Sequence, residues 1–469
     1  MFAVHPNKNF RFFLLLILIA AVVYSLMLTG CAQIGAPTGG PKDTLAPVLV
    51  KASPDNKTIN FKGNRINISF NEYIELKDLS ENLIISPLPK HNPIISSSLR
   101  TISIKLKDTL SPNTTFSIDF GNAVADINEG NILKGFSYVF STGSQIDSFQ
   151  LKGKVWLAES GKTDSTLKVL LYRNAPDSAV QTKRPDYLTR LNGKGEFVFN
   201  NLPADEFRVY VLKDGDGNKF YNAKTETFGF LDQPIASAEN PESISLYAYA
   251  EKEQDKIPAA TSSKKSEEKK LRYVNNFING KQDLLQPLEL SFPSALKNWN
   301  KDSIWFCDTN YKPIAGSAIT LDSTRKKISL SKTWVPDEQL HLILKPKYAE
   351  DSTGLTILKN DTIHFTVKSI AEYGSLKINF SNLDLSKHPL LQFMDGEQVK
   401  WKFPVTANTW QNKMMLPGEF EVRVLYDVNE NGKWDPGDYG KKKQPERAIT
   451  LQQKIAIKAD WDNERDVEL

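Results

Sequence analysis

Hydrophobic and polar residues alternate along most of this chain, which is the pattern of half-buried antiparallel strands. The alternation is clear in residues 66–70, 116–120 and 136–140, and it returns in the second half at residues 288–292 and 340–344. Turn residues separate these short segments, and long segments with apolar residues at helical spacing are absent from the sequence. The pattern therefore predicts an all-β fold.

One segment near the N-terminus departs from this alternation. Residues 12–27 are almost entirely apolar, and Lys8 and Arg11 precede them with positive charge. This order of charge and apolar length is typical of a secretory signal peptide. A membrane-spanning helix is the alternative, since about 17 apolar residues can just cross a bilayer.

The residues that follow decide between these alternatives. They read Leu28-Thr29-Gly30-Cys31 and resemble the lipobox of bacterial lipoproteins, in which the cysteine thiol carries a lipid after cleavage. The resemblance implies that residues 1–30 are a lipoprotein signal peptide and that Cys31 is the site of lipidation. We expect the acyl chains, palmitate included, to anchor the protein to a membrane of the cell envelope, the outer membrane being favoured.

Composition argues against nucleic-acid binding and against an internal disulfide. The formal net charge is +4, and removing residues 1–30 with their two basic side chains leaves +2, so binding to nucleic acid has no electrostatic support. Cys307 is the one cysteine left beside Cys31, so no internal disulfide is expected. Because Cys307 ends an apolar, strand-like segment, we interpret it as a small buried side chain.

Two segments of low complexity divide the chain. Residues 31–45 are rich in Gly, Pro and Thr, and we expect them to form a flexible tether. Residues 251–270 mix lysines and acids with almost nothing to bury, which predicts a disordered linker. This linker separates two halves of similar length, and we expect the halves to fold independently.

The two halves repeat each other. Residues 66–71 resemble residues 288–293, and residues 206–214 resemble residues 419–427 at a constant offset of 213. A shared turn, strand and acidic loop at constant spacing is a specific signal of an internal repeat. The repeat predicts four modules, which we name A (46–147), B (148–250), A′ (271–372) and B′ (373–469).

The modules resemble two known families of β-sandwich. Module A is similar to the bacterial Ig-like domain of the SbsA surface-layer type, through the segments around residues 46–54, 110–116 and 136–143. Module B is similar to the transthyretin-like or carboxypeptidase-regulatory-like sandwich, through residues 193–199 and 201–212. These resemblances imply spacer or adhesive modules without an active site, in an envelope protein that contacts another protein or a glycan.

An acidic loop in B′ has the spacing of a calcium loop. Counted from Asp427, oxygen-bearing side chains fall at positions 1, 3, 5, 9 and 12, Gly432 is at position 6 and Lys433 can offer its carbonyl at position 7. The candidate ligands are Asp427, Asn429, Asn431, Lys433, Asp435 and Asp438. The alternative is a metal-free turn, because Asn, Asp and Gly are also the residues that tight turns require.

Other chemistry has less support. None of the five histidines, His5, His91, His341, His364 and His388, lies at metal-ligand spacing from another, so no zinc site is predicted. Motifs of nucleophilic, phosphate-binding or metalloprotease sites are absent from the sequence, which favours a non-enzymatic protein. A glycan-binding protein is the alternative function, with Trp401, Trp410 and Trp434 as its aromatic platform. A hydrolase comes third, because it needs an acidic pair that a sequence cannot show.

The lipidation hypothesis predicts that Cys31→Ser abolishes labelling by a palmitate analogue. Loss of the acyl chains removes the apolar burial that holds the protein at the bilayer, so the variant should leave the membrane fraction. Cys307→Ser is the matched control and should be labelled as strongly as the unmodified chain. Undiminished labelling of Cys31→Ser would refute the hypothesis.

Overall fold

A computed structural model describes residues 8–27, 42–239, 242–251 and 270–469. Cys31 and most of the tether and of the linker lie outside these described residues, so lipidation and linker disorder stay predictions. Within the expected signal peptide the chain forms helix α1 (Lys8–Met27). Among the helices in the described part of the chain, none is long and apolar enough to span a membrane.

The prediction of an all-β fold is confirmed. Beyond α1, the described residues contain only helices of one turn, namely α2 (Leu79–Asn82), α3 (Ala179–Thr182), η1 (Ser237–Glu239), η2 (Lys301–Ser303), η3 (Ile370–Glu372), η4 (Leu385–Lys387) and η5 (Tyr439–Lys441). The strands form separate sheets in four successive regions of the chain.

Modules A and A′ share one topology. Module A contains β1 (Leu49–Ser53), β2 (Arg65–Phe70), β3 (Ile74–Leu76), β4 (Ile84–Ser86), β5 (Ile94–Ser98), β6 (Thr101–Lys105), β7 (Thr115–Asp119), β8 (Val124–Asp126) and β9 (Ser137–Ser141). Its sheets have the orders β1-β2-β6-β5, β3-β8 and β4-β7-β9. Alternate residues of β2, such as Ile66 and Ile68, are fully buried in the core between the sheets.

Module A′ repeats these sheets strand for strand. It contains β18 (Val274–Asn275), β19 (Lys281–Gln282), β20 (Leu288–Ser291), β21 (Leu296–Trp299), β22 (Ile304–Cys307), β23 (Ala318–Leu321), β24 (Lys327–Ser331), β25 (Gln339–Leu344), β26 (Ala349–Asp351) and β27 (Asp361–Val367). The orders are β18-β20-β24-β23, β21-β26 and β19-β27-β25-β22, so only the short parallel strand β19 is additional. The internal repeat inferred from the sequence is therefore present in the topology.

Module B is a second kind of sandwich. Its strands are β10 (Phe149–Leu157), β11 (Lys168–Arg173), β12 (Tyr187–Arg190), β13 (Glu196–Leu202), β14 (Glu206–Leu212), β15 (Phe228–Phe230), β16 (Ile235–Ala236) and β17 (Ile244–Ala248). One sheet has the order β13-β10-β17, with β10 and β17 parallel, and the other has the order β12-β11-β14-β15 with β16 beside β14.

Module B′ has the same two sheets. Its strands are β28 (Gly374–Ser381), β29 (Pro389–Asp395), β30 (Gln398–Pro404), β31 (Thr409–Met415), β32 (Gly418–Tyr426), β33 (Ala448–Thr450), β34 (Ile455–Ile457) and β35 (Asp462–Glu468). The orders are β31-β28-β35, with β28 and β35 parallel, and β30-β29-β32-β33 with β34 beside β32.

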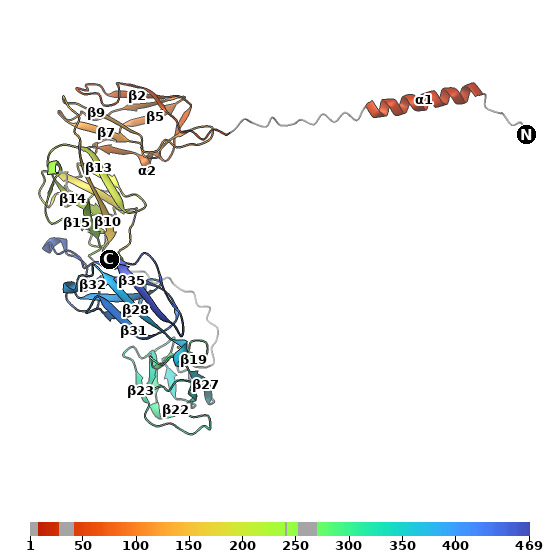
Figure 1. Ribbon diagram of the computed structural model, residues 1–469, viewed down its shortest axis with the longest axis vertical. Coiled ribbons are helices and arrows are strands. Elements are labelled where there is room, and N and C mark those ends of the chain that lie inside the picture. The colour runs from red at the N-terminus through yellow and green to blue at the C-terminus, as the bar shows by residue number, and fades with distance from the viewer. Residues whose placement is uncertain (1–7, 28–41, 240–241, 252–269) are drawn as a thin grey trace, which may run out of the picture.

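The modules do not follow one another in space as they do in sequence. Figure 1 shows A above B, then B′, and A′ at the far end, so the spatial order is A-B-B′-A′. The two modules of the B type are therefore neighbours at the centre, although module A′ separates them in the sequence.

The contact between B and B′ is a shared hydrophobic core. The sheet that contains β11 and β14 buries one face inside module B and carries a second buried cluster on its outer face. Tyr439 of B′ enters this outer cluster with a side chain that is 6% exposed. Its ring lies 5.0 Å from that of Phe228 and 5.1 Å from that of Phe230, both edge-on. Its hydroxyl donates to the carbonyl of Asp177 at 2.7 Å.

Main-chain contacts tie the same two modules together. The amide of Ala448, in edge strand β33, donates to the carbonyl of Ala158 at 2.8 Å, and the hydroxyl of Thr450 bonds the carbonyl of Ser160. Gly161 lies in this turn with φ of +65°, and a Cβ there would come within 2.5 Å of the carbonyl of Ala448. A larger residue would be strained both by its own backbone and by the facing strand.

The first residue of the predicted linker is part of this interface. The carboxylate of Glu251 accepts from the Tyr221 hydroxyl at 2.8 Å, from Lys224 Nζ at 2.6 Å and from the amide of Tyr439 at 3.1 Å. Burial alone would raise the pKa of Glu251, but these hydrogen bonds hold it below its usual value. Glu251, the last described residue before residue 270, therefore belongs to the interface between B and B′.

The expectation that the two halves fold independently does not fit this interface. The outer cluster of module B is completed by Tyr439 and Trp434 of the other half, so separating the halves would expose aromatic side chains of B to water. Independent folding stays a prediction, and this contact, which the linker does not carry, argues against it.

The shared core predicts that one residue of B′ controls the stability of both central modules. Tyr439→Ala should lower the free energy of unfolding by about 3 kcal/mol, because it removes a buried ring and leaves a cavity. Tyr439→Phe should cost only about 1 kcal/mol, since it removes one hydrogen bond and keeps the packing. Hydrogen exchange should show faster exchange in both β15 and β33 of the alanine variant. A loss of protection confined to B′ would contradict the shared core.

Candidate functional site

The predicted calcium ligands lie on the loop that leads from β32 to Tyr439, the residue that packs into module B. Asp427 is 3% exposed, and its carboxylate accepts the amide of Gly432 at 2.6 Å and that of Asn431 at 3.1 Å. The amide nitrogens of Asn429 and Asn431 both point to the carboxylate of Asp435. The structure thus brings four of the predicted side chains together, and the loop is closed by its own hydrogen bonds.

The remaining candidates are placed differently. Lys433 has its amide bonded to Asn431 Oδ1 at 2.7 Å. Asp438 begins η5, where its carboxylate accepts the Lys441 amide at 3.1 Å and forms an ion pair with Lys441 Nζ at 3.3 Å. Asp438 therefore serves the turn that presents Tyr439, and no contact found among the described residues joins its carboxylate to Asp427 or Asp435.

Sequence reasoning missed a further carboxylate at this loop. Glu446 is 8% exposed, and it accepts the amide of Val428 at 2.9 Å and that of Asp435 at 3.0 Å. Burial and then the charges of Asp427 and Asp435 raise the pKa of Glu446 above its usual value. A cation would relieve this repulsion, but Glu446 lies 19 positions after Asp427 and outside any calcium-loop spacing.

The described residues do not form a ready metal cage. No group of three or more His, Cys, Asp or Glu side chains within them is arranged to hold an ion. Calcium would also require Asn429 and Asn431 to turn their amide oxygens inward, since both now direct nitrogen to Asp435. As folded, the loop is a turn, and calcium stays a prediction.

The three tryptophans of the proposed glycan platform are half-buried. Trp401 and Trp410 pack against the buried ring of Phe393 at 6.1 Å and 5.9 Å. Trp434 packs against the outer cluster of module B and against the small cluster that contains Ala448 of β33, and it donates to the carbonyl of Glu446 at 2.8 Å. Trp401 and Trp434 border one cavity of about 480 Å³, whereas Trp410 is not part of its lining. Glycan binding stays a prediction.

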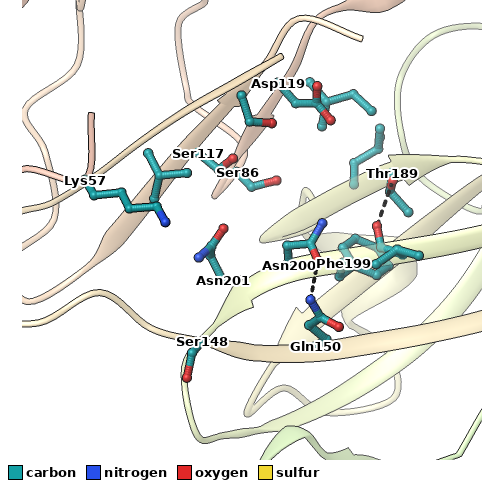
Figure 2. A pocket seen from close by; sticks show the side chains of 15 residues that line it. Lys57, Ser86, Ser117, Asp119, Ser148, Gln150, Thr189, Phe199, Asn200 and Asn201 are labelled. Atoms are coloured by element: carbon teal, nitrogen blue, oxygen red, sulfur yellow. Dashed lines mark hydrogen bonds between the residues drawn. The ribbon is translucent and has the colours of Figure 1, made fainter. Parts of the chain in front are cut away.

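A polar cavity of about 330 Å³ marks the joint between A and B (Figure 2). Hydroxyl and amide groups dominate its lining, and on the side of module B Gln150 of β10 donates to Asn200 of β13 at 2.8 Å. The labelled lining residues are Lys57, Ser86, Ser117, Asp119, Ser148, Gln150, Thr189, Phe199, Asn200 and Asn201. Within the described residues, no serine or cysteine is hydrogen-bonded to a histidine, so this joint offers no activated nucleophile of that kind.

The structure also places Cys307 and two of the histidines. Cys307 is fully buried, as expected for a small core side chain. Burial and the charge of Asp308 raise the pKa of its thiol above the usual value, which lowers its reactivity. His341 and His364 contact each other on the surface of A′, although their spacing in sequence gave no sign of a pair.

Comparison with known proteins supports one part of the chain specifically. A family model described as a bacterial Ig-like domain matches residues 43–142, which confirms the resemblance expected for module A. No curated protein matches the chain. The family match gives the N-terminal module a fold, and the transthyretin-like resemblance of B and B′ stays a prediction.

Solved structures give only distant similarities. The N-terminal part of the bacterial S-layer protein SbsC is 11% identical, with a TM-score of 0.16, over 36% of this chain and 40% of that one. The Bacillus anthracis TIE protein is 11% identical, with a TM-score of 0.15, over 92% and 75%. The Bacillus cereus major pilin subunit BcpA is 8% identical, with a TM-score of 0.16, over 69% and 99%. The chain thus spans less than half of the SbsC fragment, and such low scores support no functional comparison.

The calcium hypothesis predicts that millimolar Ca²⁺ raises the melting temperature of the full chain relative to chelator. Extracellular sites have a Kd of about 10⁻⁴ to 10⁻³ M, and free metal at tenfold Kd stabilises by about 1.4 kcal/mol. Asp427→Asn should erase this difference, whereas Asp214→Asn, in the equivalent loop of B, should keep it. Equal melting temperatures with calcium and with chelator would leave the metal-free turn as the correct interpretation.

Proposed function

We propose that the chain is a lipid-anchored, non-enzymatic spacer of the cell envelope that holds module A′ away from the membrane. The observation that carries this proposal is the spatial order A-B-B′-A′, which sets A next to the predicted anchor and A′ at the other end of the row (Figure 1). The Ig-like family match of module A supports a structural role at the cell surface.

The central joint makes such a spacer stiff. Burial of Tyr439 and the main-chain bonds of β33 fix B against B′, so the two modules behave as one body. The joint between B′ and A′ is also direct, since the Tyr373 hydroxyl donates to Asp283 at 2.7 Å and accepts the Leu284 amide at 2.8 Å. A short connection held by hydrogen bonds keeps A′ in line with B′.

The joint between A and B has a different character. Its contacts include hydrogen bonds from the Leu88 amide to the Asp186 carbonyl at 2.7 Å and from Arg190 to the Ser80 carbonyl at 3.2 Å, and residues of both modules line a second cavity of about 670 Å³. Polar joints of this kind resist bending less than a buried aromatic contact. We therefore infer that the spacer bends near its anchor and stays straight beyond it.

The spacer proposal predicts different distances to the membrane for dyes on A and on A′. Val50→Cys in module A and Leu358→Cys in module A′ place thiols at positions that are 66% and 73% exposed, while Cys307 is buried and unreactive. In lipidated protein on vesicles, energy transfer to a membrane acceptor should be strong from position 50 and weak from position 358.

Weakening the central joint supplies the control. Tyr439→Ala should increase transfer from position 358, because a loosened joint lets A′ approach the bilayer, and should leave transfer from position 50 unchanged. Equally strong transfer from both positions in the unaltered joint would overturn the spacer function, even where Cys31 is shown to carry lipid.

A further inference from the structure

Two histidines of A′ face each other across neighbouring strands. Strands β25 and β27 are antiparallel, with His341 directly opposite His364. Their Nδ1 atoms are 2.6 Å apart, and the ring planes are nearly perpendicular at 88° with centroids 4.3 Å apart. His364 is exposed and His341 half-buried, so the pair lies at the surface of the module.

The surroundings hold this pair in place. The ring of Tyr311 stacks on His341 with a centroid distance of 4.7 Å and an angle of 28°. On the other side in the sheet, the register partner of His341 is Cys307, which is fully buried and bridged to Pro313. The His341 ring is stacked on one face and lies beside a buried residue of the neighbouring strand. A ring held in this way loses little conformational freedom when it binds a ligand.

Two facing imidazole nitrogens are a ligand pair for a transition metal. At 2.6 Å one Nδ1 must donate a proton to the lone pair of the other. A metal ion that replaces this proton, displaced from the line between the two nitrogens, would take both lone pairs. The displaced proton would move to the Nε2 of its own ring, so two neutral rings would bind the ion without net proton release. Imidazole suits Cu²⁺, Ni²⁺ and Zn²⁺.

The order of intrinsic affinities selects among these ions, because it places Cu²⁺ above Ni²⁺ and Zn²⁺. With metal–nitrogen bonds of about 2.05 Å, a right angle at the metal needs the nitrogens about 2.9 Å apart, and a tetrahedral angle needs about 3.3 Å. Both values exceed the observed 2.6 Å, so the two rings would move apart to admit any of these ions.

We propose that His341 and His364 form a binding site for a divalent transition-metal ion, with Cu²⁺ preferred, on the outer surface of module A′. No third His, Cys, Asp or Glu completes the site within the described residues, so water would fill the other positions. The site is separate from the acidic loop of B′, whose oxygen ligands suit calcium and not copper.

Titration of the full chain with Cu²⁺ alone, followed by calorimetry and by electron paramagnetic resonance, tests the proposal. We expect one tight site with two nitrogen ligands. His364→Gln and His341→Gln should each weaken it by about 10²-fold, because the second imidazole binds intramolecularly. Binding should weaken in the order Cu²⁺, Ni²⁺, Zn²⁺.

The other histidines supply matched controls. His91→Gln and His388→Gln should leave the affinity unchanged, because His91 is paired with Asp108 at 2.7 Å in module A and His388 lies near Glu430 at 3.4 Å in module B′. Full affinity in His364→Gln would overturn the proposal. Because His364 is exposed, a loss of affinity in this variant is not explained by misfolding. Equal losses in the control variants, or a spectrum with a single nitrogen ligand, would do the same.

Discussion

The burial of Tyr439 between two modules is the contact on which the arrangement of this protein depends. The ring belongs to B′ but is packed by aromatic side chains of B, and its hydroxyl and amide are bonded to Asp177 and Glu251 of the other half. Burying one tyrosine ring fully contributes a few kcal/mol, which is a large share of the 5–15 kcal/mol that typically holds a domain together. The modules of the B type therefore share part of their core.

This shared core determines where the two Ig-like repeats lie. Because B and B′ pack together, A and A′ are directed to opposite ends, and the sequence order A-B-A′-B′ becomes A-B-B′-A′ in space (Figure 1). The character of each joint then sets its stiffness. An apolar core joins B to B′, whereas a polar cavity and hydrogen bonds lie between A and B. A stiff body on a softer joint suits a spacer that must turn at its membrane end without folding back.

The sequence predicted the strands, the repeat and the Ig-like module because each rests on local alternation or on spacing. It missed the central interface, although a signal was present in β11 and β14. Residues 169–172 and 209–212 are continuously apolar instead of alternating, as expected for strands covered on both faces. The pairs His341–His364 and Asp427–Glu446 could not be predicted, since each depends on strand register or on a loop returning from far along the chain.

The two B modules meet through an unsymmetrical contact, because B′ supplies the tyrosine and B supplies the pocket that receives it. The loops start alike, with Asp214 and Asp427 each accepting an amide five residues later, at Lys219 and Gly432. They differ at Tyr439. Its counterpart at the offset of 213 is Glu226, whose carboxylate accepts amides of its own loop. A head-to-tail contact of this kind could link successive molecules into a filament if it formed between chains. Formed within one chain, it occupies both the tyrosine and its pocket and leaves neither for another copy.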